Sequence, residues 1–133
     1  MVVNRKRIVV SSRALGFRVK VPFYIYDDVE DLRTAARRFS GGEIEDDCIG
    51  VCQAYTYEDG YVSGVLVRLW REQIGTQVLS HEVHHATTAL YGSAVAGADP
   101  QLHHANEPFA HLFSDILGKL VDRLYALGYY PSQ

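Results

Sequence analysis

The stretch Leu79–Ala86, with the sequence LSHEVHHA, constrains this chain more than any other. His81 and His85 are four residues apart, and an α-helix brings such residues to one face, ~6 Å apart along its axis. Two imidazoles so placed can bind one zinc ion from a single helix. Glu82 lies at the flank of that face, where its carboxylate can reach a water molecule on the metal. The H-E-x-x-H spacing therefore predicts two metal ligands, His81 and His85, and a general base, Glu82.

The surrounding sequence predicts that this motif lies on a helix. No proline or glycine interrupts residues 76–91, and apolar residues recur there at helical spacing. Thr76 is the expected N-cap, and Gly92 is expected to end the helix in a left-handed conformation.

A second helix is predicted to begin near Asn106, because Pro108 is tolerated only in a first helical turn. Glu107 would lie at the head of this helix, and a hairpin of the two helices would bring its carboxylate to the metal as third ligand. Two histidines and a glutamate leave the fourth position for water, which is typical of a catalytic zinc site. His103 and His104 are the alternative third ligands.

A helix pair with surface histidines and a salt-bridged glutamate would need no metal. All six histidines of the chain, however, lie between residues 81 and 111. This density is hard to explain by surface decoration, so the metal site is the preferred interpretation.

The sequence HEVHH, followed by Asn106–Glu107, resembles the gluzincin branch of the zinc metallopeptidases, in which a glutamate on a later helix completes the site. The segment NEPFAHL, which begins at Asn106, is also similar to the second motif of small HExxH proteins encoded by tailed bacteriophages. The resemblance covers residues 79–117. It implies that His81, His85 and Glu107 are zinc ligands and that Glu82 is the catalytic base.

The chain departs from that pattern at His111. Many gluzincins place an aspartate four residues after the ligand glutamate, where it binds a ligand imidazole; here that residue is a histidine. We expect His111 to act as such a partner or as an oxyanion stabiliser. His84, His104 and Tyr91 are further candidates for the oxyanion role.

Length and composition fit one soluble domain, residues 1–133, with enough chain for a sizeable core. The net charge of −3 argues against nucleic acid as a partner. The sequence holds one basic and one acidic cluster, both interpreted as solvated faces. These are Arg5, Lys6, Arg7, Arg13, Arg18 and Lys20, and then Glu43, Glu45, Asp46 and Asp47.

No targeting or membrane segment is expected. Charges interrupt the first residues every few positions, and no stretch approaches the ~20 apolar residues of a membrane span. Cys48 and Cys52 are predicted to lie on the same strand. Four residues along a strand would place their Cα atoms ~13 Å apart, beyond the ~7 Å limit for a disulfide. Free thiols suit a reducing compartment, so we expect the cytoplasm, or the host cytoplasm for a phage protein. A zinc knuckle of these cysteines is the alternative, but no second pair completes it.

The hydrophobic patterns predict strands at residues 7–12, 16–26, 48–57 and 61–70. A helix is expected to start at Asp28 and to stop at Gly41–Gly42, and Pro22 suggests an edge or a bend. The order β-β-α-β-β-α-α predicts an α+β, minimal zincin-like domain. In such a domain, a small twisted sheet packs on a layer of helices that carries the HExxH motif and the downstream glutamate.

These features predict a zinc-dependent hydrolase of the metallopeptidase type. The substrate would be a peptide or protein bound along a sheet edge, with residues 61–70 as the candidate edge strand. An interior strand buried on both faces is the alternative for this segment. The alternative function is a catalytically weak or inactive zincin-fold binding or regulatory protein that uses zinc structurally. A third hypothesis is a zinc hydrolase that acts on a non-peptide amide.

Overall fold

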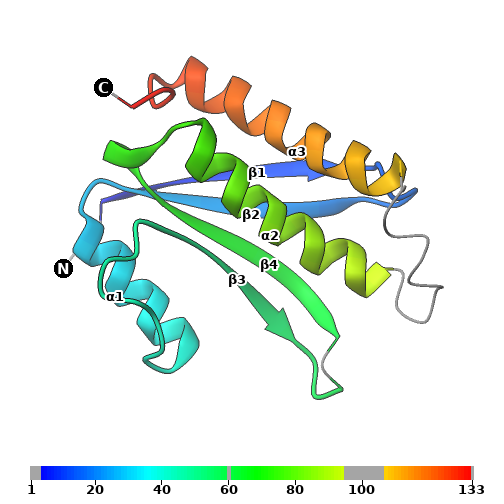
Figure 1. Cartoon of the computed structure of the whole chain (residues 1–133), viewed down its shortest axis with the longest axis horizontal. Coiled ribbons are helices and arrows are strands. Elements are labelled where there is room, and N and C mark those ends of the chain that lie inside the picture. The colour runs from blue at the N-terminus through cyan, green and yellow to red at the C-terminus, as the bar shows by residue number, and fades with distance from the viewer. Residues whose placement is uncertain (1–3, 60, 95–106, 133) are drawn as a thin grey trace.

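The computed structural model describes residues 4–59, 61–94 and 107–132, and Figure 1 shows their arrangement. The predicted order of strands and helices is confirmed, and so is the α+β class. Likeness to zincins within that class stays a prediction. The elements are β1 (Arg5–Ser12), β2 (Val19–Tyr26), α1 (Val29–Ser40), β3 (Gly50–Thr56), β4 (Val62–Trp70), a 3₁₀ turn (Arg71–Gln73), α2 (Thr76–Ala94) and α3 (Glu107–Ala126).

The four strands form one mixed sheet in the order β1-β2-β4-β3. Neighbours pair antiparallel except β2 and β4, which run parallel with Phe23 beside Val67. Alternate strand residues face α2 and α3, which lie side by side over one face of the sheet (Figure 1). This layer buries the main core, in which each fully buried Leu or Ile contributes ~1.5–3 kcal/mol. Its members include Ile8, Phe23, Ile25, Val67, Leu69, Leu79, Val83, Leu112, Ile116, Leu120 and Leu124.

Helix α1 packs against the opposite face of the sheet, with Leu32 and Ala36 fully buried. The predicted ends of this helix are confirmed. The Asp28 carboxylate accepts a hydrogen bond from the Glu30 backbone N–H at 2.8 Å, and Gly41 ends the helix with φ of 76°.

The prediction that residues 61–70 form a sheet edge is wrong. Strand β4 lies between β2 and β3, and residues 65–69 are all buried. A continuous buried run is typical of an interior strand, and among the described strands β3 is the edge on this side. Pro22 is likewise not on an edge strand. The sheet tolerates it because β2 begins to pair with β4 only at Phe23.

Several predicted boundaries also shift. Gly92 does not end α2, which continues to Ala94, and Thr76 is the first helical residue, with its hydroxyl 2.6 Å from the Tyr130 hydroxyl. Strand β2 starts at Val19 because Gly16, with φ of 88°, belongs to the preceding turn. Asn106, the expected cap of the next helix, lies outside the described residues. Among the described helices, none combines the length and the apolar character that crossing a membrane requires.

Candidate metal centre

Helix α2 presents His81 and His85 on one exposed face, as the four-residue spacing requires. Their Nε2 atoms are 3.2 Å apart, and their ring planes are nearly perpendicular. A tetrahedral zinc ion with Zn–N bonds of ~2.0–2.1 Å separates two nitrogen ligands by ~3.3 Å. The two imidazoles, which form a hydrogen bond with each other here, are therefore spaced so that they could hold one metal ion. Burial and the charges of His81 and His84 lower the pKa of His85, which favours the neutral form that binds metals.

Glu82 joins this pair from within the protein. One ligand atom from each of His81, Glu82 and His85 lies within 4.8 Å of the others, and the Glu82 residue is only 5% exposed. Within the described part of the chain, no hydrogen bond reaches its carboxylate. Burial raises the pKa of Glu82, and the neighbouring His81 partly offsets this rise. A carboxylate with a raised pKa is a better proton acceptor than an exposed one.

The edge strand β3 passes directly over Glu82 at Gly50. A Cβ atom at this position would lie 3.3 Å from the Glu82 Oε2 atom and 3.3 Å from the Val78 Cγ1 atom. Only glycine gives the backbone this approach without displacing a neighbour. In the sequence, Gly50 is only a glycine near the start of a predicted strand. Its close approach to Glu82 follows from the position of α2 beneath β3.

A groove of about 930 Å³ opens beside these residues, between α2 and the segment that leads into β3. Three carboxylates outside the metal group line it, those of Glu43, Glu45 and Asp47, and its described lining contains no Lys or Arg. The predicted acidic cluster is therefore not only a solvated face, because these three of its four members border the candidate metal centre.

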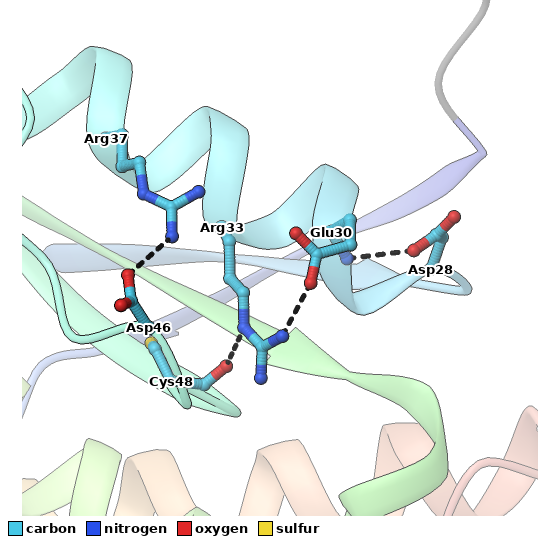
Figure 2. Close-up of polar contacts among 6 residues, drawn as sticks. All are labelled: Asp28, Glu30, Arg33, Arg37, Asp46 and Cys48. Carbon is cyan, nitrogen blue, oxygen red and sulfur yellow. Dashed lines mark hydrogen bonds and ion pairs between the residues drawn. The ribbon is translucent and has the colours of Figure 1, made fainter.

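Helix α1 holds this acidic segment in place, as Figure 2 shows. The Arg33 Nε atom donates a hydrogen bond to the Cys48 carbonyl oxygen at 2.9 Å, and its Nη1 atom pairs with Glu30 at 2.6 Å. Arg37 pairs with Asp46 at 3.4 Å. These contacts fix the backbone that carries the groove carboxylates.

Both cysteines are free, as predicted, and both line the groove. Cys48 precedes β3 rather than lying on it, and its thiol donates to the Gly50 carbonyl oxygen at 3.3 Å. Burial, together with the Glu82 charge, raises the pKa of Cys52 to about 12. Neither sulfur belongs to the metal-ligating group of the described residues.

Glu107 and His111 lie together at the start of α3, away from the three grouped residues. The Glu107 Oε2 atom is 3.5 Å from the His111 Nε2 atom, and both side chains are largely exposed. The structure therefore does not bring Glu107 into the group of His81, Glu82 and His85. Its role as third ligand, and that of His111 beside it, stay predictions.

The oxyanion candidates differ in their surroundings. His84 packs its ring edge-on against Phe109 of α3 at 5.8 Å between centroids, and Tyr91 is buried against the same ring at 5.5 Å. Both side chains thus join α2 to α3. His103 and His104 lie outside the described residues.

Comparison of the chain with protein-family models, with curated proteins and with solved structures gives no match.

Proposed function

We propose that this protein is a zinc-dependent hydrolase of the metallopeptidase type. The proposal depends chiefly on one observation. The largely buried Glu82 side chain reaches the groove beside two imidazoles at zinc-binding separation, and no hydrogen bond from a described residue holds its carboxylate. A metal site that only stabilises the fold has no need of such a carboxylate. The carboxylate is left open toward the groove, where a water molecule or a substrate can reach it, and this favours a chemical role.

Zinc, when bound by His81 and His85, would supply Lewis-acid polarisation and a water molecule acidified to a pKa near neutral. Beside it, the Glu82 carboxylate would accept the proton that the attacking water molecule loses. The same carboxylate then passes the proton to the leaving amine. Its raised pKa suits both steps, because it can hold the proton between them.

Glu107 is the proposed third ligand and His111 its proposed partner. Both are exposed at the head of α3, and the 3.5 Å contact between them is open to solvent, so it costs little to break. Helix α3 is already packed against α2 through Phe109 and His84. The third ligand would therefore come from a helix that is fixed next to the histidine pair.

The proposed substrate is a peptide or protein segment in extended form. Strand β3, rather than β4, offers the free sheet edge, and the groove runs beside it. Backbone hydrogen bonds to a sheet edge hold an extended peptide in register. The free thiols favour activity in a reducing compartment, for which we propose the cytoplasm, or the host cytoplasm for a phage protein.

The substitution Glu82→Gln tests this function, because it keeps the shape of the side chain and all other groups. We expect unchanged zinc content, nearly unchanged thermal stability and a cleavage rate lowered ~10²–10⁴-fold. The measurement is cleavage of a peptide library at matched zinc occupancy. Glu72→Gln, an exposed carboxylate on the 3₁₀ turn, is the matched control and should keep full activity.

Two outcomes would count against the hydrolase. A wild type that binds zinc but cleaves no peptide would support the alternative, a zincin-fold binding or regulatory protein. Equal cleavage by wild type and Glu82→Gln would remove this carboxylate from the mechanism.

A further inference from the structure

The basic residues of this chain are concentrated in its first hairpin. Residues 1–26 contain six of the 13 Lys and Arg residues and none of the 16 Asp and Glu residues. Strands β3 and β4 also contain no acidic residue, so the sheet itself offers no carboxylate to these cations. The net charge of −3 is thus the sum of a strongly positive hairpin and a strongly negative rest of the chain. It therefore does not exclude a polyanionic partner for the hairpin.

Three arginines of the sheet converge on one tyrosine ring. The guanidinium carbons of Arg5, Arg68 and Arg7 lie 4.8, 5.7 and 6.0 Å from the centroid of the Tyr24 ring. Arg7 is directly opposite Tyr24 on β1, and Arg68 is beside it on β4. None of the three has a carboxylate partner within the described residues. Three like charges around one ring, with no counter-charge, are suited to an anion.

Arg68 differs from the other two because it is buried. Its Nε atom donates to the Gln53 side-chain oxygen and its Nη1 atom to the Tyr26 hydroxyl, both at 2.8 Å. These hydrogen bonds hold its positive charge in place beside the Tyr24 ring. Arg5 and Arg7 are exposed above the same ring, where a ligand can reach them.

We propose that the outer face of the β1–β2 hairpin binds single-stranded nucleic acid. Arg5, Arg7 and Lys20, which pairs with Ser11 across the hairpin, form a row of cations ~20 Å long on this face. Phosphates repeat along a nucleic-acid strand in the same linear manner. Arginine planes and an aromatic ring supply the stacking platform that single strands use, which an acidic protein segment would not need. Helix α1 packs mainly over β3 and β4 and leaves this row accessible.

This surface lies on the opposite face of the sheet from the metal centre, and its proposal does not depend on hydrolase activity. The test is fluorescence anisotropy of a labelled oligothymidine of ~16 nucleotides, titrated with the full chain at several salt concentrations. We expect binding that weakens about tenfold between ~50 and ~200 mM salt, since each neutralised phosphate of a single strand contributes a logarithmic slope of ~0.7.

The double variant Arg5→Ser/Arg7→Ser should weaken binding about tenfold at low salt and flatten the salt dependence. Lys6→Ser is the matched control, because it removes the same charge from the same strand but on the other face of the sheet. Thermal unfolding of each variant verifies that the fold is retained.

The proposal is overturned if the oligomer does not bind at low salt, or if Lys6→Ser weakens binding as much as Arg7→Ser does. Competition decides the class of partner. Displacement by polyglutamate as effective as by unlabelled oligothymidine would identify an acidic protein partner instead. Equal affinity for the matching duplex would overturn the preference for single strands.

Discussion

The groove at strand β3 and the β1–β2 hairpin carry opposite charge. At the β3 edge, the groove beside the candidate metal centre is lined by carboxylates and lacks Lys and Arg among its described residues. In the β1–β2 hairpin, residues 1–26 contain six basic residues and no acidic one. The comparison shows that basic and acidic residues are concentrated in different parts of the molecule and nearly cancel in the net charge of −3. The net charge of the whole chain is therefore a poor guide to the partners of either region.

The edges also differ in how a buried charge is accommodated. Arg68, 6% exposed, has neutral hydrogen-bond partners in Gln53 and Tyr26. Glu82, 5% exposed, has none within the described residues and faces the groove. Neighbouring side chains hold Arg68 in place, whereas the Glu82 carboxylate is open to the groove, as the proposed general base must be. Four predictions test this difference.

The largest expected effect concerns the proposed metal ligands. His85→Ala and Glu107→Ala should each weaken zinc affinity by orders of magnitude, because each would remove a proposed ligand. His103→Ala and His104→Ala should leave affinity within several-fold. Competitive titration with a chelator measures all four variants. A stronger loss in either of the last two would assign the third ligand to a histidine instead of Glu107.

The second effect concerns the thiol beside Glu82. The rise of the Cys52 pKa from 9.0 to about 12 leaves about a thousandfold less thiolate at pH 8 than an ordinary cysteine has. Alkylation by iodoacetamide should be correspondingly slow. Its rate should keep rising about tenfold per pH unit beyond pH 9, because the pKa is shifted upward.

Mass spectrometry of the alkylated peptide gives this rate, and the unfolded chain is the control. Fast alkylation in the folded protein, levelling near pH 9, would mean that Cys52 is solvated. Solvent would then reach this side of the groove, and the burial that raises the pKa of Glu82 would be reduced.

Sequence reasoning found the parts of this molecule that depend on local spacing. His81, Glu82 and His85 come together because helical periodicity alone places them, and the element order follows from local patterns and caps such as Asp28. It failed where a distant partner decides. The edge strand depends on the parallel pairing of β2 with β4, and that pairing encloses β4 and leaves β3 outside.

The same distinction explains what was missed at the site. The role of Gly50 depends on α2 passing beneath β3, and that of Glu43, Glu45 and Asp47 depends on the anchoring of their segment by α1. Neither relation is visible in a sequence window. Glu107 depends in turn on the geometry between two helices, which spacing along the chain does not fix.

The third effect tests the close approach of β3 to Glu82. In Gly50→Ala, the added methyl group meets the Glu82 Oε2 atom at 3.3 Å and must displace the carboxylate or the strand. We expect cleavage to slow about tenfold, since small misplacements of a catalytic group cost up to ~10²-fold. Gly64→Ala is the matched control: it also adds a methyl group within the sheet, but the nearest contact is an ordinary 4.0 Å. Equal activity of the two variants would show that Glu82 tolerates displacement.

The smallest effect concerns the charge of the substrate at the acidic edge. Glu43, Glu45 and Asp47 line the groove, so peptides with Lys or Arg near the cleaved bond should be preferred over otherwise identical peptides with Asp or Glu. At a distance of ~6 Å in water, each exposed carboxylate should favour a Lys or Arg peptide about threefold over a neutral peptide, and should disfavour an Asp or Glu peptide by about the same factor. Added salt should reduce the preference, because these charges are open to solvent.

Glu45→Gln and Asp47→Asn should each lower that preference, measured as the ratio of kcat/KM for the two peptides. Asp46→Asn removes an equal charge from the same segment, but Asp46 pairs with Arg37 and does not line the groove. It should leave the ratio unchanged. An equal loss in all three variants would mean that the segment acts only through its overall charge. A ratio near one in the wild type would mean that the groove does not select its substrate by charge, and the contrast between the two edges would then hold for the structure but not for function.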